Sequence, residues 1–180
     1  MALKLSDGEK LILVMLAEVH KELKIRDNID PDLVLSAIFN KSTFGLEWTY
    51  SSLFGAEGET PPEVVTEVVD ILDMWSFLES GYRELSDEDR QHIADAVPYG
   101  GKNVIFPGFD GNNETDHFGA ARFLVNDLGR WGELKGRSLN SHSESLPRYR
   151  AMLRVFTPIR ATLEGPMSAD QIITVLKRGD

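Results

Sequence analysis

The 180-residue sequence contains no cysteine. Without a thiol, the chain cannot form a disulfide scaffold, a thiolate zinc site, an iron–sulfur cluster or a cysteine nucleophile. Long hydrophobic runs are also missing: the longest, Leu11–Leu16, is too short to cross a bilayer, so we expect no membrane partner. Positive charge is scarce. The 19 lysines and arginines against 29 acidic residues give a net charge of −10, which argues against broad nucleic-acid binding.

The apolar content of 42% is enough for a buried core without a structural metal. The first nine residues lack a basic targeting region, and no small-residue cleavage site follows, so we expect a cytoplasmic protein. The length favours one domain over residues 1–180, in which the turn-rich loop at 98–112 is where an internal boundary would fall.

Helix start signals recur along the chain. Ser6 and Glu9 have capping-box spacing, as do Ser168 and Gln171, and Asp30 precedes a proline suited to a first helical turn. After Ser6, apolar residues recur at three- and four-residue steps, which predicts one apolar face of a helix; they are Ile12, Met15, Leu16, Val19 and Leu23.

Other segments extend the helical pattern. We expect helices at 46–54, closed by Gly55, after the Thr60–Glu63 cap, and from 113 to 128, and we expect Pro158 to bend or end a later one. The fold class predicted is therefore mostly α. It is a compact, bundle-like array of seven or eight helices with at most a very short extended segment, at 104–106.

Charge is uneven along the sequence. Residues 1–95 hold 20 acidic and 8 basic residues, whereas residues 96–180 hold 9 acidic and 11 basic residues. Either a solvated acidic face lies in the first half, or the molecule is polarised and the second half binds an anion or a partner.

Familiar catalytic and cofactor motifs are incomplete. Gly100–Asn103 lacks the earlier glycine and the following Ser or Thr of a phosphate loop, so we interpret it as a turn. No G-x-S-x-G elbow occurs, and the four histidines do not have metal-site spacing. The sequence predicts no cofactor.

One dense cluster of potential metal ligands comprises Asp110, Asn112, Glu114, Asp116 and His117. Its spacing departs from an EF-hand, because position six is not glycine and position twelve is not glutamate. The cluster either caps a helix N-terminus and offsets its dipole, or holds a metal or ligand.

Arginines follow the cluster. Arg122, Asn126 and Arg130 fall at four-residue steps, as do Arg150 and Arg154. Guanidinium groups at the border of a core bind carboxylate or phosphate in a bidentate manner, or form internal ion pairs with buried acids.

Residues 103–110 (NVIFPGFD), 121–126 (ARFLVN) and 129–131 (GRW) resemble the central signature of the YfbU family of prokaryotic proteins, and 148–153 (RYRAML) extends the likeness. The resemblance covers nearly the whole chain. It implies a compact helical protein from a family without an assigned activity, so no catalytic residue carries over. Positions that match the signature are Asp110, Glu114, Arg122, Asn126 and Arg130.

Three functions stay open. The first is a non-catalytic ligand-binding or regulatory module that takes a small anion at the loop-to-helix junction, where helix N-terminal amides and arginines meet. Its candidate residues are Phe109, Asp110, Arg122, Asn126, Arg130, Arg150 and Arg154. The second is a metal-assisted hydrolase that uses Asp110, Glu114, Asp116 and His117. The third is a protein-interaction scaffold, or a homo-oligomer, that pairs through the apolar segment 46–54.

Overall fold

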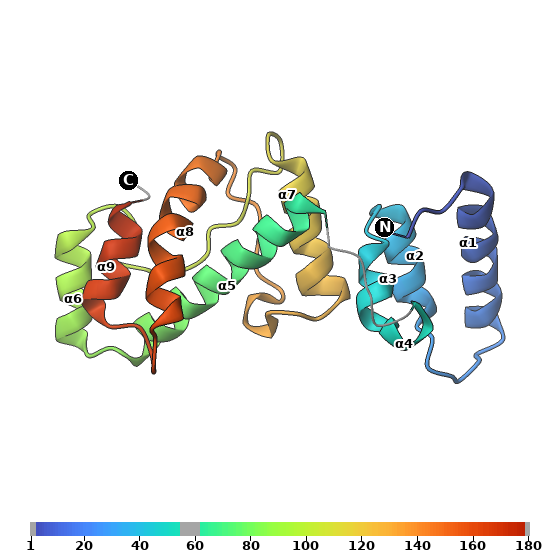
Figure 1. Ribbon diagram of the computed structural model, residues 1–180, viewed down its shortest axis with the longest axis horizontal. Coiled ribbons are helices and arrows are strands. Elements are labelled where there is room, and N and C mark those ends of the chain that lie inside the picture. The colour runs from blue at the N-terminus through green and yellow to red at the C-terminus, as the bar shows by residue number, and fades with distance from the viewer. Residues whose placement is uncertain (1–2, 55–61, 179–180) are drawn as a thin grey trace. The chain divides into compact units, whose positions relative to one another are not determined.

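A computed structural model describes residues 3–54 and 62–178 (Figure 1). The described part contains nine α-helices, a π-helical turn and a 3-10 turn, and no strand, so the mostly-α prediction is confirmed. The elements are α1 (Asp7–Glu22), α2 (Pro31–Phe39), α3 (Phe44–Thr49), α4 (Ser51–Phe54), α5 (Glu63–Glu84), α6 (Asp87–Ala96), α7 (Thr115–Arg122), η1 (Phe123–Asp127), η2 (Gly132–Leu134), α8 (Leu146–Ala161) and α9 (Ala169–Lys177). No helix in the described residues is both long enough and apolar enough to span a membrane.

The chain divides into two compact units. Unit 1 comprises residues 1–66 and 119–136, and unit 2 comprises 67–118 and 137–180. The divisions fall at 66, 118 and 136, within α5, within α7 and after η2, and not in the loop at 98–112. Each unit is described below by itself, and the single-domain organisation stays a prediction.

In unit 1, α2 packs against α1, α3 and η1. The ring of Phe44 makes an edge contact with the ring of Phe123, with 5.6 Å between centroids. A Cβ at Gly45 would overlap that same ring, so glycine is needed for α3 to approach so closely. Because η1 is wound as a π-helix, three consecutive residues, Phe123, Leu124 and Val125, are all buried.

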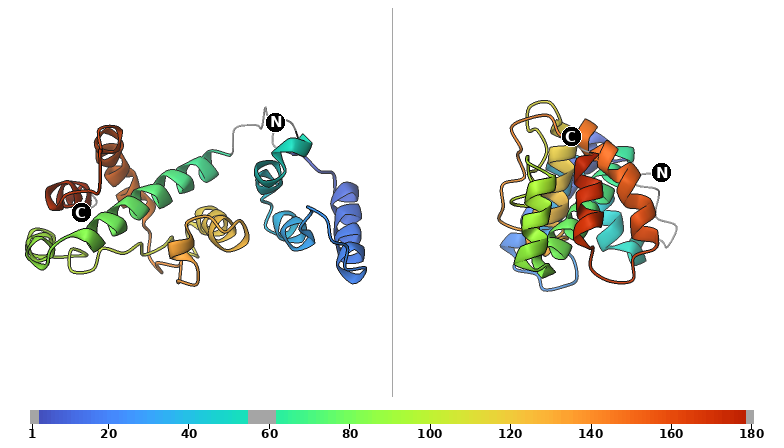
Figure 2. Two further views of the ribbon diagram at one scale, coloured as in Figure 1. Left: turned by 90° about the horizontal axis from the view of Figure 1, so that it is seen from below. Right: turned by 90° about the vertical axis from the view of Figure 1, so that its left-hand side faces the viewer.

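In unit 2, α6, α8 and α9 gather beside α5 (Figure 2, left), and α9 packs against both α6 and α8. An aromatic cluster of Trp75, Phe106, Phe109 and Tyr149 fills the core, with ring centroids 5.5 to 5.9 Å apart. Tyr149 donates its hydroxyl proton to the carbonyl oxygen of Gly108 at 2.7 Å, and burial raises the pKa of this phenol.

The loop before α7 is fixed to a second loop by a parallel bridge between Phe109 and Asn140. The amide of Phe109 donates to the carbonyl oxygen of Leu139 at 2.9 Å, and the amide of Ser141 donates to that of Phe109 at 3.0 Å. Gly108 has a φ of +101°, and a Cβ there would overlap the Leu139 backbone. Only glycine fits at this position.

Local capping signals are confirmed, while two expected helix boundaries differ. The helix expected at 46–54 breaks at Tyr50 into α3 and α4, and α8 continues through Pro158 to Ala161. At 104–106, where at most a very short extended segment is expected, the described residues form no strand, which agrees with the expectation. Gly55 and the first two residues of the cap at 60–63 lie outside the described residues.

Candidate functional site

The loop-to-helix junction at the start of α7 is held by its own carboxylates. Asp110 is 3% exposed; its Oδ1 accepts the amide of Asn112 at 2.9 Å, and its Oδ2 accepts the side-chain amide of Asn113 at 2.7 Å. These bonds, led by the one from the Asn112 amide, hold the pKa of Asp110 below its ordinary value. Asp110 is therefore an ionised cap inside the loop.

Glu114 ties three segments together. Its Oε1 accepts the amides of Ser145 and Leu146, both at 2.7 Å, and its Oε2 accepts the Asp110 amide at 2.8 Å and the Ser145 hydroxyl at 2.7 Å. Burial alone would raise the pKa of Glu114, but these four hydrogen bonds outweigh it and lower the pKa. Because Ser145 and Leu146 begin α8, Glu114 occupies the place where an external anion would meet that helix N-terminus.

A second network lies between α5, α7 and α8. Arg150 donates to Glu67 through Nε at 2.6 Å and Nη2 at 2.8 Å, and the Nε2 atom of His117 lies 2.8 Å from the same carboxylate. The bonds from Arg150, more than that with His117, lower the pKa of Glu67 to about 2. The pair is an internal bidentate ion pair.

Glu79 forms a third network. It is 7% exposed, accepts the Phe106 amide at 2.7 Å and pairs with Arg137 at 2.8 Å. Neither residue was singled out from the sequence, because they stand 58 residues apart and share no motif. Their pairing anchors the Phe106 loop to α5.

Three residues of the predicted metal cluster take part in these networks: Asp110 and Glu114 in the first and His117 in the second. Asp116 is exposed, whereas Glu114 and His117 bind different partners. Across the described ranges, no three or more His, Asp or Glu side chains are arranged to hold a metal ion. The geometry thus gives the metal-hydrolase hypothesis no support.

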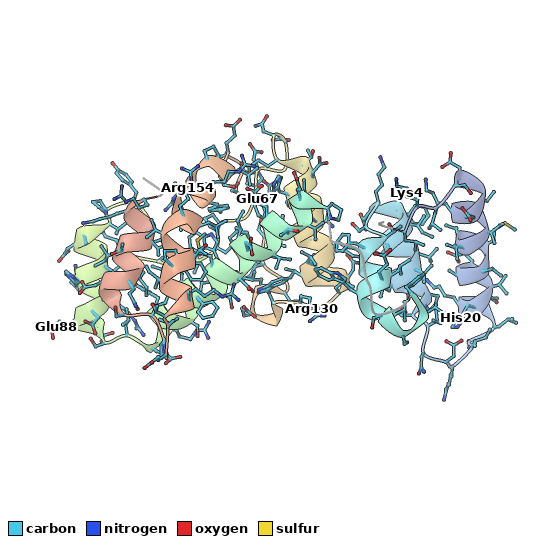
Figure 3. The ribbon with its side chains drawn as sticks, viewed as in Figure 1. Lys4, His20, Glu67, Glu88, Arg130 and Arg154 are labelled. Carbon is cyan, nitrogen blue, oxygen red and sulfur yellow. The ribbon has the colours of Figure 1, made fainter. Side chains whose placement is uncertain are left out.

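The predicted anion-binding residues are divided between the two units. Phe109, Asp110, Arg150 and Arg154 belong to unit 2, whereas Arg122, Asn126 and Arg130 belong to unit 1. Arg154 and Arg130 are exposed (Figure 3), and so are Arg122 and Asn126. A site that uses both sets stays a prediction.

Unit 1 contains a groove that the sequence did not reveal. It has a volume of about 600 Å³ and is lined by Leu3, Lys4, Leu5, Lys10, Ile38, Phe39, Lys41 and Thr43, a set we call the lysine groove. These residues come from the segment before α1, from α1, from the end of α2 and from its connection to α3. Three of the eight are lysines and none is acidic, although residues 1–95 hold 20 acidic and only 8 basic residues.

Hydrogen bonds hold the walls of the lysine groove in place. The amide of Leu3 donates to Glu47 Oε1 at 2.7 Å, and the hydroxyl of Thr43 donates to the carbonyl oxygen of Leu3 at 3.1 Å. Lys10 pairs with Asp7 at 2.9 Å. Lys4 (Figure 3) and Lys41 are exposed and make no ion pair or hydrogen bond through their side chains within the described residues.

Lys41 occupies an unusual backbone position. It has a φ of +54° immediately after the C-cap of α2, and the amides of Lys41 and Ser42 close the helix end on the carbonyls of Ile38 and Ala37. This is a Schellman motif with lysine where glycine is usual. Because glycine is the usual sequence signal of this motif, the sequence gives no sign of it at Lys41.

Comparisons with known proteins cover both units. The YfbU domain matches residues 3–177. The UPF0304 protein MJECS11 of Methanocaldococcus jannaschii is 30% identical over 158 residues, which cover 84% of this chain and 87% of that protein. The resemblance seen in the sequence is confirmed, and the chain belongs to the YfbU family.

Proposed function

We propose that the protein is a non-catalytic binding module whose ligand is an organic anion with an apolar body, held in the lysine groove of unit 1. The observation that carries the proposal is the composition of the groove: three lysines, four apolar side chains and no acid among its described lining residues. Its volume of about 600 Å³ lies within the range of small-molecule sites, roughly 300–1,000 Å³.

Each part of such a ligand has a counterpart in the groove. Lys4 and Lys41 have no anionic partner within the described residues, so an ion pair with a ligand does not first require an internal pair to break. Phe39 is 71% exposed, and covering it with an alkyl chain removes apolar surface from water. A ligand that carries both charge and apolar surface therefore gains more than either part alone.

The groove is favoured over the junction at α7 because the junction is already occupied. An anion there would have to displace Asp110 or Glu114 from the hydrogen bonds they accept, and this would leave a buried carboxylate unpaired. The lysine groove involves no such displacement.

The proposal is tested with octanoate, octanol and inorganic phosphate as probes, by thermal shift and calorimetry. Octanoate at about 100 times its dissociation constant stabilises the fold by roughly 2.7 kcal/mol, and the unfolding temperature rises by several degrees. We expect a smaller shift with octanol, which lacks the charge, and with phosphate, which lacks the alkyl chain.

Lys41→Gln should weaken octanoate binding about tenfold, since a hydrogen bond to a charged group is worth about 1.5 kcal/mol or more. The matched control is Lys24→Gln. Lys24 has almost the same backbone conformation, with a φ of +53° after α1, but does not line the groove. Equal affinities for octanoate in the two variants would contradict the proposal, as would binding of octanol as tight as that of octanoate.

A further inference from the structure

The first helix exposes an apolar stripe. The stripe consists of six apolar side chains, five on α1 and one at its C-cap, each with an exposed fraction between 51% and 67%: Leu11, Ile12, Met15, Leu16, Val19 and Leu23. They recur at three- and four-residue steps, so they share one side of α1, and the opposite side, with Ala17 buried, faces α2.

The stripe is large for a protein of this size. Six side chains of this exposure present on the order of 600 Å², the upper end of the roughly 300–600 Å² typical of the largest apolar patch on a monomer. Two such stripes buried against each other remove about 1,200 Å² from water, the lower limit for a stable specific interface.

We infer that two copies of the chain pair through this stripe as an antiparallel, two-fold symmetric pair of α1 helices. The site is separate from the lysine groove, and the inference does not depend on the proposed function. A closed dimer requires one surface to complement itself, and the order of residues along α1 meets this requirement.

Reversal of the helix about a point between Met15 and Leu16 exchanges four of the six stripe residues with one another, and it sets Leu11 opposite His20 of the partner subunit. Ile12 then lies opposite Val19 of the partner subunit, and Gly8 lies opposite Leu23 of the partner subunit. A Cβ at Gly8 would meet nothing within 4 Å, so the surface there is open to receive a large side chain. The large side chain of Leu23 thus meets a glycine of the partner subunit, which leaves room for it.

Charges along one edge of the stripe support the same direction. His20 follows Glu9 by eleven residues, about three helical turns, so the two lie on the same edge at opposite ends of α1. On this edge, an antiparallel pair brings Glu9 of each copy beside His20 of the partner subunit, a ring that also contacts Asp27 of its own chain at 3.1 Å, whereas a parallel pair sets like charges side by side. The dipoles of two antiparallel helices also attract each other, because the positive end of each lies beside the negative end of the other.

A hollow borders the stripe on its α2 side. It has a volume of about 120 Å³, and its lining is almost wholly apolar: Leu13, Leu16, Ala17, His20, Ile29, Pro31 and Val34. Leu16 belongs both to the stripe and to the hollow. The surface therefore has both a recess and projecting side chains, and paired helices pack by placing the side chains of one into the grooves of the other.

The absence of cysteine allows a direct test by disulfide trapping in the full chain. Met15→Cys lies near the two-fold axis and should give a covalent dimer under mild oxidation. Ile12→Cys alone should not, because its two copies are displaced by seven residues, about 10 Å along the axis, beyond disulfide reach. Ile12→Cys mixed with Val19→Cys should give a mixed dimer.

Leu53→Cys is the matched control. Leu53 is 69% exposed on α4, within the segment 46–54 that the sequence suggested as an interface. Covalent dimer from Leu53→Cys equal to that from Met15→Cys would overturn the inference. Self-linking of Ile12→Cys would overturn the antiparallel arrangement.

Sedimentation velocity of the unsubstituted chain gives an independent measure. We expect a dimer that dissociates on dilution, a monomer for Ile12→Glu with unchanged circular dichroism, and a dimer for Leu53→Glu. A monomer at every concentration overturns the inference. In that case the stripe is either covered within the chain or binds a membrane surface, and binding to neutral phosphatidylcholine vesicles distinguishes the two. The Ile12→Glu variant should still bind octanoate, so loss of the dimer can be distinguished from loss of binding in the lysine groove.

Discussion

Glu114 is buried and accepts four hydrogen bonds from Asp110, Ser145 and Leu146. Glu114→Gln keeps the shape but turns an acceptor into a donor that faces other donors. We expect a loss of about 3 kcal/mol in the free energy of unfolding, measured by urea denaturation. Glu144→Gln, at an exposed carboxylate in the adjacent loop, should change stability by less than about 0.5 kcal/mol. A similar loss in both variants would contradict this role for Glu114.

Glu67 makes stability depend on pH in a defined window. Because Arg150 lowers its pKa from 4.5 to about 2, ionised Glu67 stabilises the fold above pH 4.5, and this contribution is lost as the pH falls from 4.5 towards 2. Arg150→Gln should lower the free energy of unfolding by about 1 kcal/mol at pH 7. The difference from the unsubstituted chain should shrink on acidification.

Arg154→Gln is the matched control for that experiment. Arg154 lies one turn further along α8, is exposed and forms no ion pair within the described residues. Its substitution should leave the acid dependence of unfolding unchanged. A constant difference between Arg150→Gln and the unsubstituted chain from pH 7 to pH 3 would show that Glu67 is not the titrating partner.

At the scale of elements, two glycines with positive φ distinguish the cost of a strained backbone conformation from the cost of a steric overlap. Gly136 has a φ of +80°, and a Cβ there would meet only open space, whereas a Cβ at Gly108 would overlap the Leu139 backbone. Gly136→Ala should cost about 1 kcal/mol and Gly108→Ala about 3 kcal/mol or more, measured by urea denaturation. Equal costs would mean that the bridge between Phe109 and Asn140 moves apart without penalty.

The elements that could be predicted from sequence are those set by neighbours along the chain. Ser6 with Glu9, Asp30 before Pro31, and Ser168 with Gln171 form the predicted caps, because each motif is complete within four residues. The passage of α8 through Pro158 depends on packing in unit 2, which local rules do not contain.

The candidate site was less accessible to sequence reasoning. The cluster at 110–117 was recognised by its composition, but its role as an internal cap needed Ser145 and Leu146, some thirty residues away. The lysine groove joins residue 4 to residue 41, and no periodicity links them. The stripe on α1 was predicted as an apolar face, whereas its exposure is a property of the folded chain.

At the scale of the whole molecule, a net charge of −10 opposes self-association, while the stripe on α1 is uncharged. An increase in salt from about 0.01 M to about 1 M shortens the Debye length from about 30 Å to about 3 Å. We expect screening of the repulsion between the net charges to outweigh screening of the contact between Glu9 and His20 of the partner subunit, so the dimer dissociation constant should fall with added salt, as measured by sedimentation. Octanoate binding to the lysine groove should weaken over the same range. A dimer that dissociates as salt is added would contradict the pairing through the uncharged stripe. Octanoate binding that tightens as salt is added would contradict the ion pairs of the lysine groove.

The placement of the three tryptophans gives each unit its own optical signal. Trp75, 2% exposed in the aromatic cluster, is the single tryptophan of unit 2, whereas Trp48 and Trp131 belong to unit 1 and are partly exposed. Emission from Trp75 comes from an apolar surrounding and should lie at shorter wavelength than that of the other two. Spectra recorded through a denaturant titration, with Trp48→Phe and Trp131→Phe combined, would reveal whether one half of the chain can melt while the other holds.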